Sequence, residues 1–146
     1  MSTGAEGEIR CRAQLENLEF FRAFIEQACR KAGGDEAACF ALKLAVDEAC
    51  TNIVLHGYRG EPGEIALGFR DEPERVVVTI TDRAAPFSPE EIPSPDRAPG
   101  WEERPTSGLG WHFIQRTMDS VEYRPDAENG NRLVLAKRKR SAGKAR

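Results

Sequence analysis

The chain has 146 residues, of which 40% are hydrophobic, 31% charged and 8% aromatic, so we expect one domain with its own core rather than two domains or a disordered chain. No apolar run approaches the roughly 18 residues that span a bilayer, and the first ten residues carry acids where a signal peptide is apolar, which predicts a cytoplasmic protein that does not engage a membrane. The formal net charge is −3.

The charge is unevenly distributed. The last ten residues hold six of the 21 Lys and Arg and no acid, which leaves 15 basic and 24 acidic residues in the body of the chain. An acidic body argues against a nucleic-acid-binding face, so only the tail 137–146 could support such a role, and a disordered tail is the plainer interpretation. The four cysteines form no CxxC pair and are interpreted as reduced thiols of the core.

The N-terminal half predicts one strand and two helices. Residues 8–13 suit an opening strand, and apolar residues at helical spacing then continue until Gly33 and Gly34, namely Leu15, Leu18, Phe21, Ile25, Ala28 and Cys29. Phe20, Phe21 and Phe24 widen this apolar face, so the helix is either an ordinary core helix or partly a dimer or partner interface. Asp35 is a candidate N-cap for a second, Ala-rich helix that runs to Gly57.

The C-terminal half predicts two hairpins, one on each side of a proline-rich segment. Strands at 64–70 and 75–81 are followed by Asp82. Residues 83–107 contain six prolines and are expected to form a lid over an active site, with a disordered insertion as the alternative. A third helix is expected just after Gly108 and Gly110, and strands at 121–124 and 132–136 then pair across Asn129-Gly130. The predicted fold is an α+β sandwich of two layers, with a mixed sheet and helices on one face.

Three polar features could carry chemistry. Glu48 and Asn52 are four residues apart on the second helix, so both side chains can converge on one magnesium-phosphate group, although such pairs are also common on exposed helices. Asp82 follows a buried strand, where it could accept a hydrogen bond from an exocyclic amine or simply start a turn. The run Ser107-Gly108-Leu109-Gly110 could offer backbone N–H groups to phosphates at a helix start, or be a plain loop-to-helix junction.

Taken together, these features resemble the nucleotide site of the GHKL ATPase and histidine-kinase superfamily, and most closely the anti-sigma factor serine/threonine kinases. The resemblance covers roughly residues 14–138. It is carried by residues 45–58, which include Glu48, Asn52 and His56-Gly57-Tyr58, by Asp82 with Pro86-Phe87, and by 107–123. It implies a single Bergerat-type (histidine-kinase-like) ATPase domain at 1–136, with an ATP lid at about 88–107.

The resemblance also implies roles. Asn52 would ligate Mg²⁺, and Glu48 would be the general base on a protein hydroxyl or on water. Adenine would be held by Asp82, and the nucleotide would further contact Phe87, Ser107, Gly108, Leu109 and Gly110. The implied activity is ATP-dependent phosphorylation of a small anti-anti-sigma protein of the STAS type, alternating with sequestration of a sigma factor. A homodimer is compatible with this activity.

Two departures keep alternatives open. Ala84 stands where the family often has glycine, which would reduce adenine affinity or shift the loop, and Ser107 stands without a neighbouring basic residue. A partner-binding module without phosphoryl transfer is therefore the second hypothesis. A histidine-kinase-like catalytic domain acting on a separate dimerisation domain is the third, although His56 and His112 both fall inside the ATP-binding fold.

Overall fold

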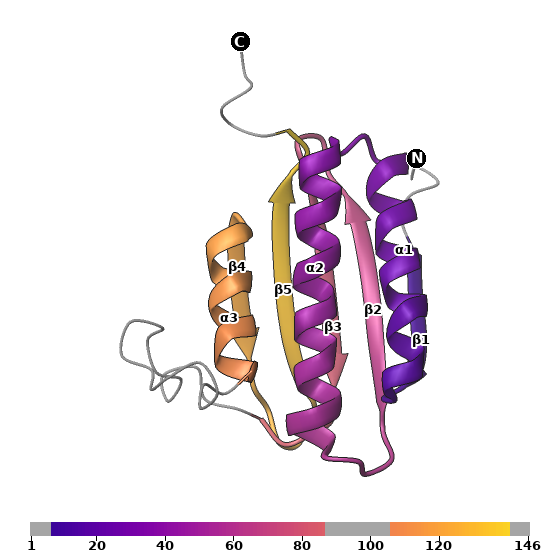
Figure 1. Ribbon diagram of the computed structural model, residues 1–146, viewed down its shortest axis with the longest axis vertical. Helices are drawn as coiled ribbons and strands as arrows, with labels where there is room; N and C mark the ends of the chain where they lie inside the picture. The colour runs from indigo at the N-terminus through magenta and orange to yellow at the C-terminus, as the bar shows by residue number, and fades with distance from the viewer. Residues whose placement is uncertain (1–6, 87–105, 141–146) are drawn as a thin grey trace.

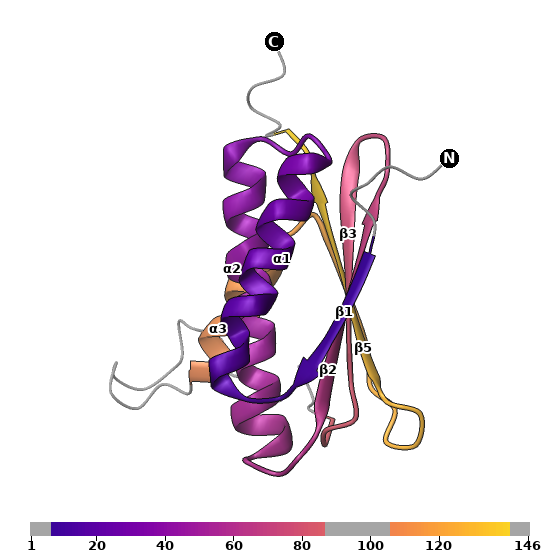
Figure 2. The same ribbon diagram turned by 90° about the vertical axis from the view of Figure 1, so that its right-hand side faces the viewer.

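The computed structural model of the chain describes residues 7–86 and 106–140, which form a sheet covered by helices on one face (Figure 1 and Figure 2). In chain order the elements are β1 (Gly7–Arg12), η1 (Leu15–Asn17), α1 (Leu18–Lys31), α2 (Glu36–Asn52), η2 (Ile53–Tyr58), β2 (Glu64–Asp71), β3 (Arg75–Asp82), α3 (Thr106–Thr117), β4 (Ser120–Arg124) and β5 (Asn131–Arg138). The predicted two-layer α+β sandwich is confirmed. None of the helices in the described ranges is long and apolar enough to cross a membrane.

The sheet is antiparallel throughout and not mixed, so that part of the prediction was wrong. Its strand order is β1-β2-β3-β5-β4, and every neighbouring pair is antiparallel. Strands β3 and β4, which α3 connects, do run parallel to one another, but β5 lies between them and pairs with both. The crossover therefore produces no parallel ladder.

The helices begin largely where the sequence predicts. The Asp35 carboxylate accepts a hydrogen bond from the Ala38 N–H at 2.8 Å and so caps α2, and Gly33 precedes it with a φ of +94° that suits glycine. The end of α2 differs from the prediction, because the chain passes through Gly57 in a π-helical turn, η2. The turn ends only at Arg59 and Gly60, both with positive φ.

The core lies between the sheet and the helices. The fully buried side chains include Ile25, Leu42, Leu67, Ile80 and Leu135, each of which contributes about 1.5–3 kcal/mol when it leaves water. The apolar stripe of α1 buries Phe21 but leaves Phe20 62% exposed. Leu15, predicted as the first residue of that stripe, lies instead in η1, the short turn that directly precedes α1, and is 49% exposed.

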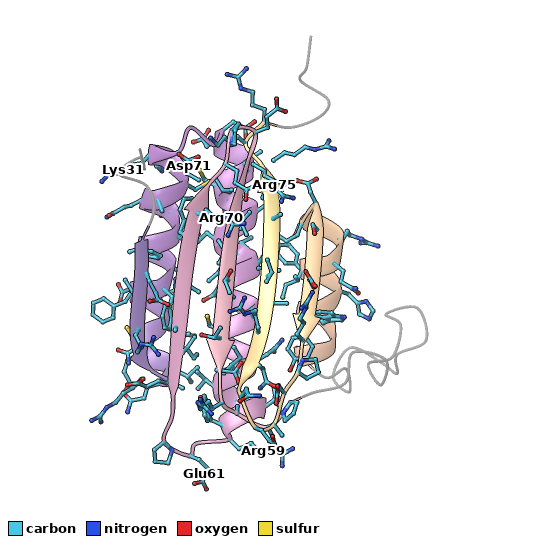
Figure 3. All side chains as sticks on the ribbon, turned by 180° about the vertical axis from the view of Figure 1, so that it is seen from behind. Lys31, Arg59, Glu61, Arg70, Asp71 and Arg75 are labelled. Carbon is cyan, nitrogen blue, oxygen red and sulfur yellow. The ribbon has the colours of Figure 1, made fainter. Side chains whose placement is uncertain are left out.

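The opposite face of the sheet carries charged side chains such as Arg70 and Arg75, and no described helix covers it (Figure 3). Arg59 and Glu61 mark the end of the sandwich where α2 passes to β2, and Asp71 marks the other end. Near Asp71, the sheet continues past the predicted domain end at residue 136. Lys137 and Arg138 belong to β5, and Lys139 forms an ion pair with Asp71 at 2.7 Å.

Candidate functional site

The C-terminal half of α2 supplies the first two residues of the site. Glu48 and Asn52 are both half-buried, one helical turn apart on the same face. Asp47 points away from this pair, as expected, and toward α1. Its carboxylate accepts a hydrogen bond from Arg22 of α1 at 2.7 Å. Of these two neighbouring acids of α2, Asp47 thus pairs with α1, whereas Glu48 lies toward α3.

Helix α3 brings a glycine directly against this pair. A Cβ at Gly110 would lie 2.5 Å from Glu48 Oε1 and 3.5 Å from Asn52 Nδ2. The first of these distances is shorter than any real contact, so a side chain at residue 110 would displace the Glu48 carboxylate. Residues of two separately predicted motifs thus meet, and their close approach depends on the missing side chain of Gly110.

The environment of Glu48 alters its acidity. Partial burial disfavours the charged carboxylate and raises the pKa of Glu48 above its ordinary value, and the negative charge of Asp47 adds to the shift. A raised pKa makes the Glu48 carboxylate a stronger proton acceptor than an ordinary glutamate, which suits a general base.

Asp82 is the last residue of β3, and its side chain is only 8% exposed. Its Oδ1 accepts two hydrogen bonds, from the Ala84 N–H at 2.8 Å and from Asn131 Nδ2 at 2.9 Å. Burial raises the pKa of Asp82, and these two hydrogen bonds oppose the rise. The carboxylate is therefore held in place while remaining a potential acceptor for a further donor.

Two residues that sequence analysis gave no role support this region. Asn131, the first residue of β5, contacts Asp82 directly. The Tyr58 hydroxyl donates to the Glu64 carbonyl oxygen and accepts from the Arg83 N–H, both at 2.8 Å, so it ties the end of η2 to the end of β3. The sequence does indicate that Asn131 is buried, because it lies two residues before the core-facing Leu133 and therefore on the same face of β5.

Ala84 is accommodated by a glycine. It is buried, and a Cβ on Gly57 would approach the Ala84 methyl group to 2.8 Å. Arg59 is the sole non-glycine residue with positive φ in the described ranges, so Ala84 adopts a backbone conformation that alanine tolerates. The substitution therefore introduces no backbone strain, while its effect on adenine affinity stays a prediction.

The glycine-rich run lies inside α3 and not before it. The helix begins at Thr106, so Ser107, Gly108 and Leu109 occupy its first turn and Gly110 follows. The expected helix start after Gly108 and Gly110 was thus too late. The run can still bind an anion, because the first four N–H groups of any α-helix lack an intrahelical acceptor and favour anions. Phe87 and residues 88–105 of the predicted lid lie outside the described residues.

The cysteines fit the interpretation as core thiols. Cys29, Cys39 and Cys50 are buried, Cys11 is only partly buried against the core, and all four are free thiols. Burial raises the pKa of the Cys50 thiol, so this neighbour of the site is a poor nucleophile despite its position. No group of three or more His, Cys, Asp or Glu side chains within the described ranges is arranged to hold a metal ion.

The donors that are present nevertheless fit a magnesium-nucleotide complex. An amide oxygen from Asn52 is a hard ligand of the kind that Mg²⁺ accepts, and the ion usually takes only one or two protein ligands together with water and phosphate oxygens. The backbone of Gly110 lies close to this side chain, since a Cβ there would come within 3.5 Å of Asn52 Nδ2. At the end of β3, Asp82 offers a carboxylate of the kind that accepts from an amino group.

The chain is similar to known proteins in sequence and in fold. The sequence pattern of the histidine kinase-like ATPase domain family matches residues 11–137. Serine-protein kinase RsbW of Bacillus cereus (strain AH187) and its counterpart from Bacillus anthracis are each 28% identical to this chain over 123 residues, which cover 82% of this chain and 77% of theirs. The catalytic domain of histidine kinase ThkA superposes with a TM-score of 0.52 over 90% of this chain and 98% of that domain, and at 16% identity this likeness concerns the fold alone.

Proposed function

The chain belongs to the histidine kinase-like ATPase domain family, and on this premise we propose that it is an ATP- and magnesium-dependent protein serine/threonine kinase of the anti-sigma type. The observation that carries the proposal is the approach of Gly110 to Glu48 and Asn52, which brings a helix start against a base and a metal-binding amide. The named relatives that are serine-protein kinases support the choice of a protein hydroxyl as acceptor.

Different residues contact the base, the phosphates and the metal ion. Asp82 accepts a hydrogen bond from the adenine amino group, and the free N–H groups in the first turn of α3, at Ser107, Gly108 and Leu109, face the phosphates, which Gly110 allows to approach closely. On the resemblance alone, we also assign Phe87 to the nucleotide site. Asn52 holds Mg²⁺, which supplies neutralisation of phosphate charge when bound.

Glu48 acts on the acceptor side of the reaction. Its carboxylate takes the proton from the attacking hydroxyl, and its raised pKa makes it a better proton acceptor than an ordinary glutamate. In the absence of a protein hydroxyl, the same carboxylate activates water. The phosphoryl group passes from the nucleotide to the hydroxyl oxygen, and the proton passes to Glu48.

The partners follow from the resemblance to anti-sigma factor kinases. We assign the phosphorylated hydroxyl to a small antagonist protein of the STAS type, and sequestration in the cytoplasm to a sigma factor. Exposed Phe20 on α1 is available for a second copy or a partner. A binding module with little or no turnover is the second candidate, and the observation that favours it is Ala84 at the position where the family often has glycine.

The test is calorimetric titration of Mg·ATP into the wild-type protein and into Asn52→Ala. Saturable binding to the wild-type protein that is lost in the variant supports the nucleotide site, whereas no binding at millimolar nucleotide refutes the kinase. Transfer of labelled γ-phosphate then separates the candidates. Glu48→Ala should bind Mg·ATP yet lose transfer, while the matched control Asp47→Ala, which removes an acid directed at Arg22, should retain transfer.

A further inference from the structure

Asp82 and Asn131 are the two buried polar side chains of the described residues, and they contact each other. They lie opposite one another in the antiparallel pair β3–β5, and Asn131 is 2% exposed. A buried polar group lowers the free energy of unfolding unless it is hydrogen-bonded, so we expect the donors and acceptors of this pair to be matched.

The carboxamide of Asn131 uses every strong donor it has. Its Nδ2 donates to Asp82 Oδ1 at 2.9 Å and to the Ala84 carbonyl oxygen at 2.8 Å, while its Oδ1 accepts from the Asp126 N–H at 3.0 Å. The Asp126 N–H determines which end of the amide carries oxygen, so the NH₂ group must face Asp82. The amide therefore cannot flip without losing all three hydrogen bonds.

The two carboxylate oxygens of Asp82 differ in their hydrogen bonds. Oδ1 receives two donors, from Ala84 and Asn131, and Oδ2 has no hydrogen-bond donor among the described residues. Since the Oδ1 contacts define the rotation of the carboxylate, they also define where Oδ2 points. On the other side of the segment, the Tyr58 hydroxyl holds the Arg83 N–H.

We propose that Asn131 is a positioning residue that orients Asp82 to select an adenine base by its exocyclic amino group. The proposal rests on the proposed nucleotide-binding function and adds a residue that sets its base specificity. Adenine presents a 6-amino donor, whereas hypoxanthine and guanine present an acceptor oxygen at that position, which would face an acceptor carboxylate. If the Asp82 carboxylate were free to rotate, the protein would lose its preference for a 6-amino group over a 6-oxygen, in addition to affinity.

The test measures the dissociation constants of ATP and inosine triphosphate with Mg²⁺ for the wild-type protein and for Asn131→Ala. We expect the wild-type protein to prefer ATP. Asn131→Ala should weaken ATP binding by about tenfold, as for loss of a hydrogen bond to a charged group, and leave inosine triphosphate nearly unaffected. The matched control Asn129→Ala removes an exposed amide of the same turn, which bonds only to Asp126, and should keep the wild-type preference.

Two further variants separate positioning from folding. Asn131→Thr keeps a hydroxyl donor at a strand position that tolerates β-branching, so it should retain part of the preference, and it carries the test if Asn131→Ala does not fold. In an Asp82→Ala background, Asn131→Ala should cause no further loss of preference, because the residue acts through Asp82.

The outcomes are distinguishable. If folded Asn131→Ala keeps the wild-type preference for ATP, or loses both nucleotides equally, the positioning role is overturned while the nucleotide site stands. A wild-type protein that binds neither nucleotide overturns the proposed function and this inference with it. A selective loss of ATP preference that is absent in Asn129→Ala supports the role.

Discussion

Gly110→Ala should separate activity from stability in this protein. The added Cβ would lie 2.5 Å from Glu48 Oε1, so the carboxylate must retreat by about 0.9 Å to reach ordinary contact. Misplacing a reacting group by about 1 Å can cost roughly a hundredfold in rate. We therefore expect phosphoryl transfer to fall by about two orders of magnitude.

Stability should move little, or in the opposite direction. Residue 110 lies within α3, where alanine is favoured over glycine by roughly 0.5–1 kcal/mol. The clash is with the end of the Glu48 side chain, which can move without disturbing the core. The free energy of unfolding of Gly110→Ala should thus equal or slightly exceed that of the wild-type protein.

The assay is single-turnover transfer of labelled γ-phosphate, with denaturant unfolding measured on the same preparations. Gly68→Ala is the matched control, since its Cβ would meet nothing closer than the Thr79 carbonyl oxygen at 3.9 Å. It should leave transfer unchanged. A folded Gly110→Ala protein that transfers phosphate at the wild-type rate would refute the assignment of Glu48 as the base held beside Gly110.

Three further outcomes follow from burial and acidity. Because burial raises the pKa of Glu48, the rate of transfer should fall on acidification at a higher pH than an ordinary glutamate would give, and this dependence should be absent from the residual rate of Glu48→Gln. The folded-state pKa of Asp82 is raised, so its ionisation opposes folding as pH rises through that pKa. Asp82→Asn should therefore increase the free energy of unfolding at pH 7, and the gain should vanish in denaturation at a pH below the unfolded pKa, about 3.9, while adenine binding is lost. Leu67→Ala removes a fully buried side chain and should lower the free energy of unfolding by about 2–5 kcal/mol in urea, against well under half of that for the control Leu55→Ala, which is 44% exposed.

Local rules accounted for the features whose causes are local. The cap at Asp35 needs only a carboxylate three residues before a free N–H, and the convergence of Glu48 and Asn52 needs only the period of one helix. The alternation of Val76, Val78 and Ile80 likewise locates β3. Each of these depends on a few residues that are neighbours in the chain.

Features that depend on distant residues were missed or wrong. The insertion of β5 between β3 and β4 is decided by pairing between strands far apart in sequence, which no short pattern records. Asn131 follows Asn129-Gly130 and so looked like part of a turn. Its role was missed because its partner Asp82 lies 49 residues away.

The start of α3 was placed late for a local reason, since the glycines were interpreted as a loop when they belong to the helix.

The same long-range contact accounts for the place of the proposed nucleotide site at this end of the sandwich. Strands β3 and β5 present apolar residues to the core until their adjoining ends, where the alternation places Asp82 opposite Asn131. Replacing both members of such a buried polar pair by apolar residues is often neutral or stabilising, so stability gives no reason for polar residues here. An apolar pair lacks a carboxylate of fixed orientation at the end of β3, and such a carboxylate is what the proposed site for an amino-bearing base requires.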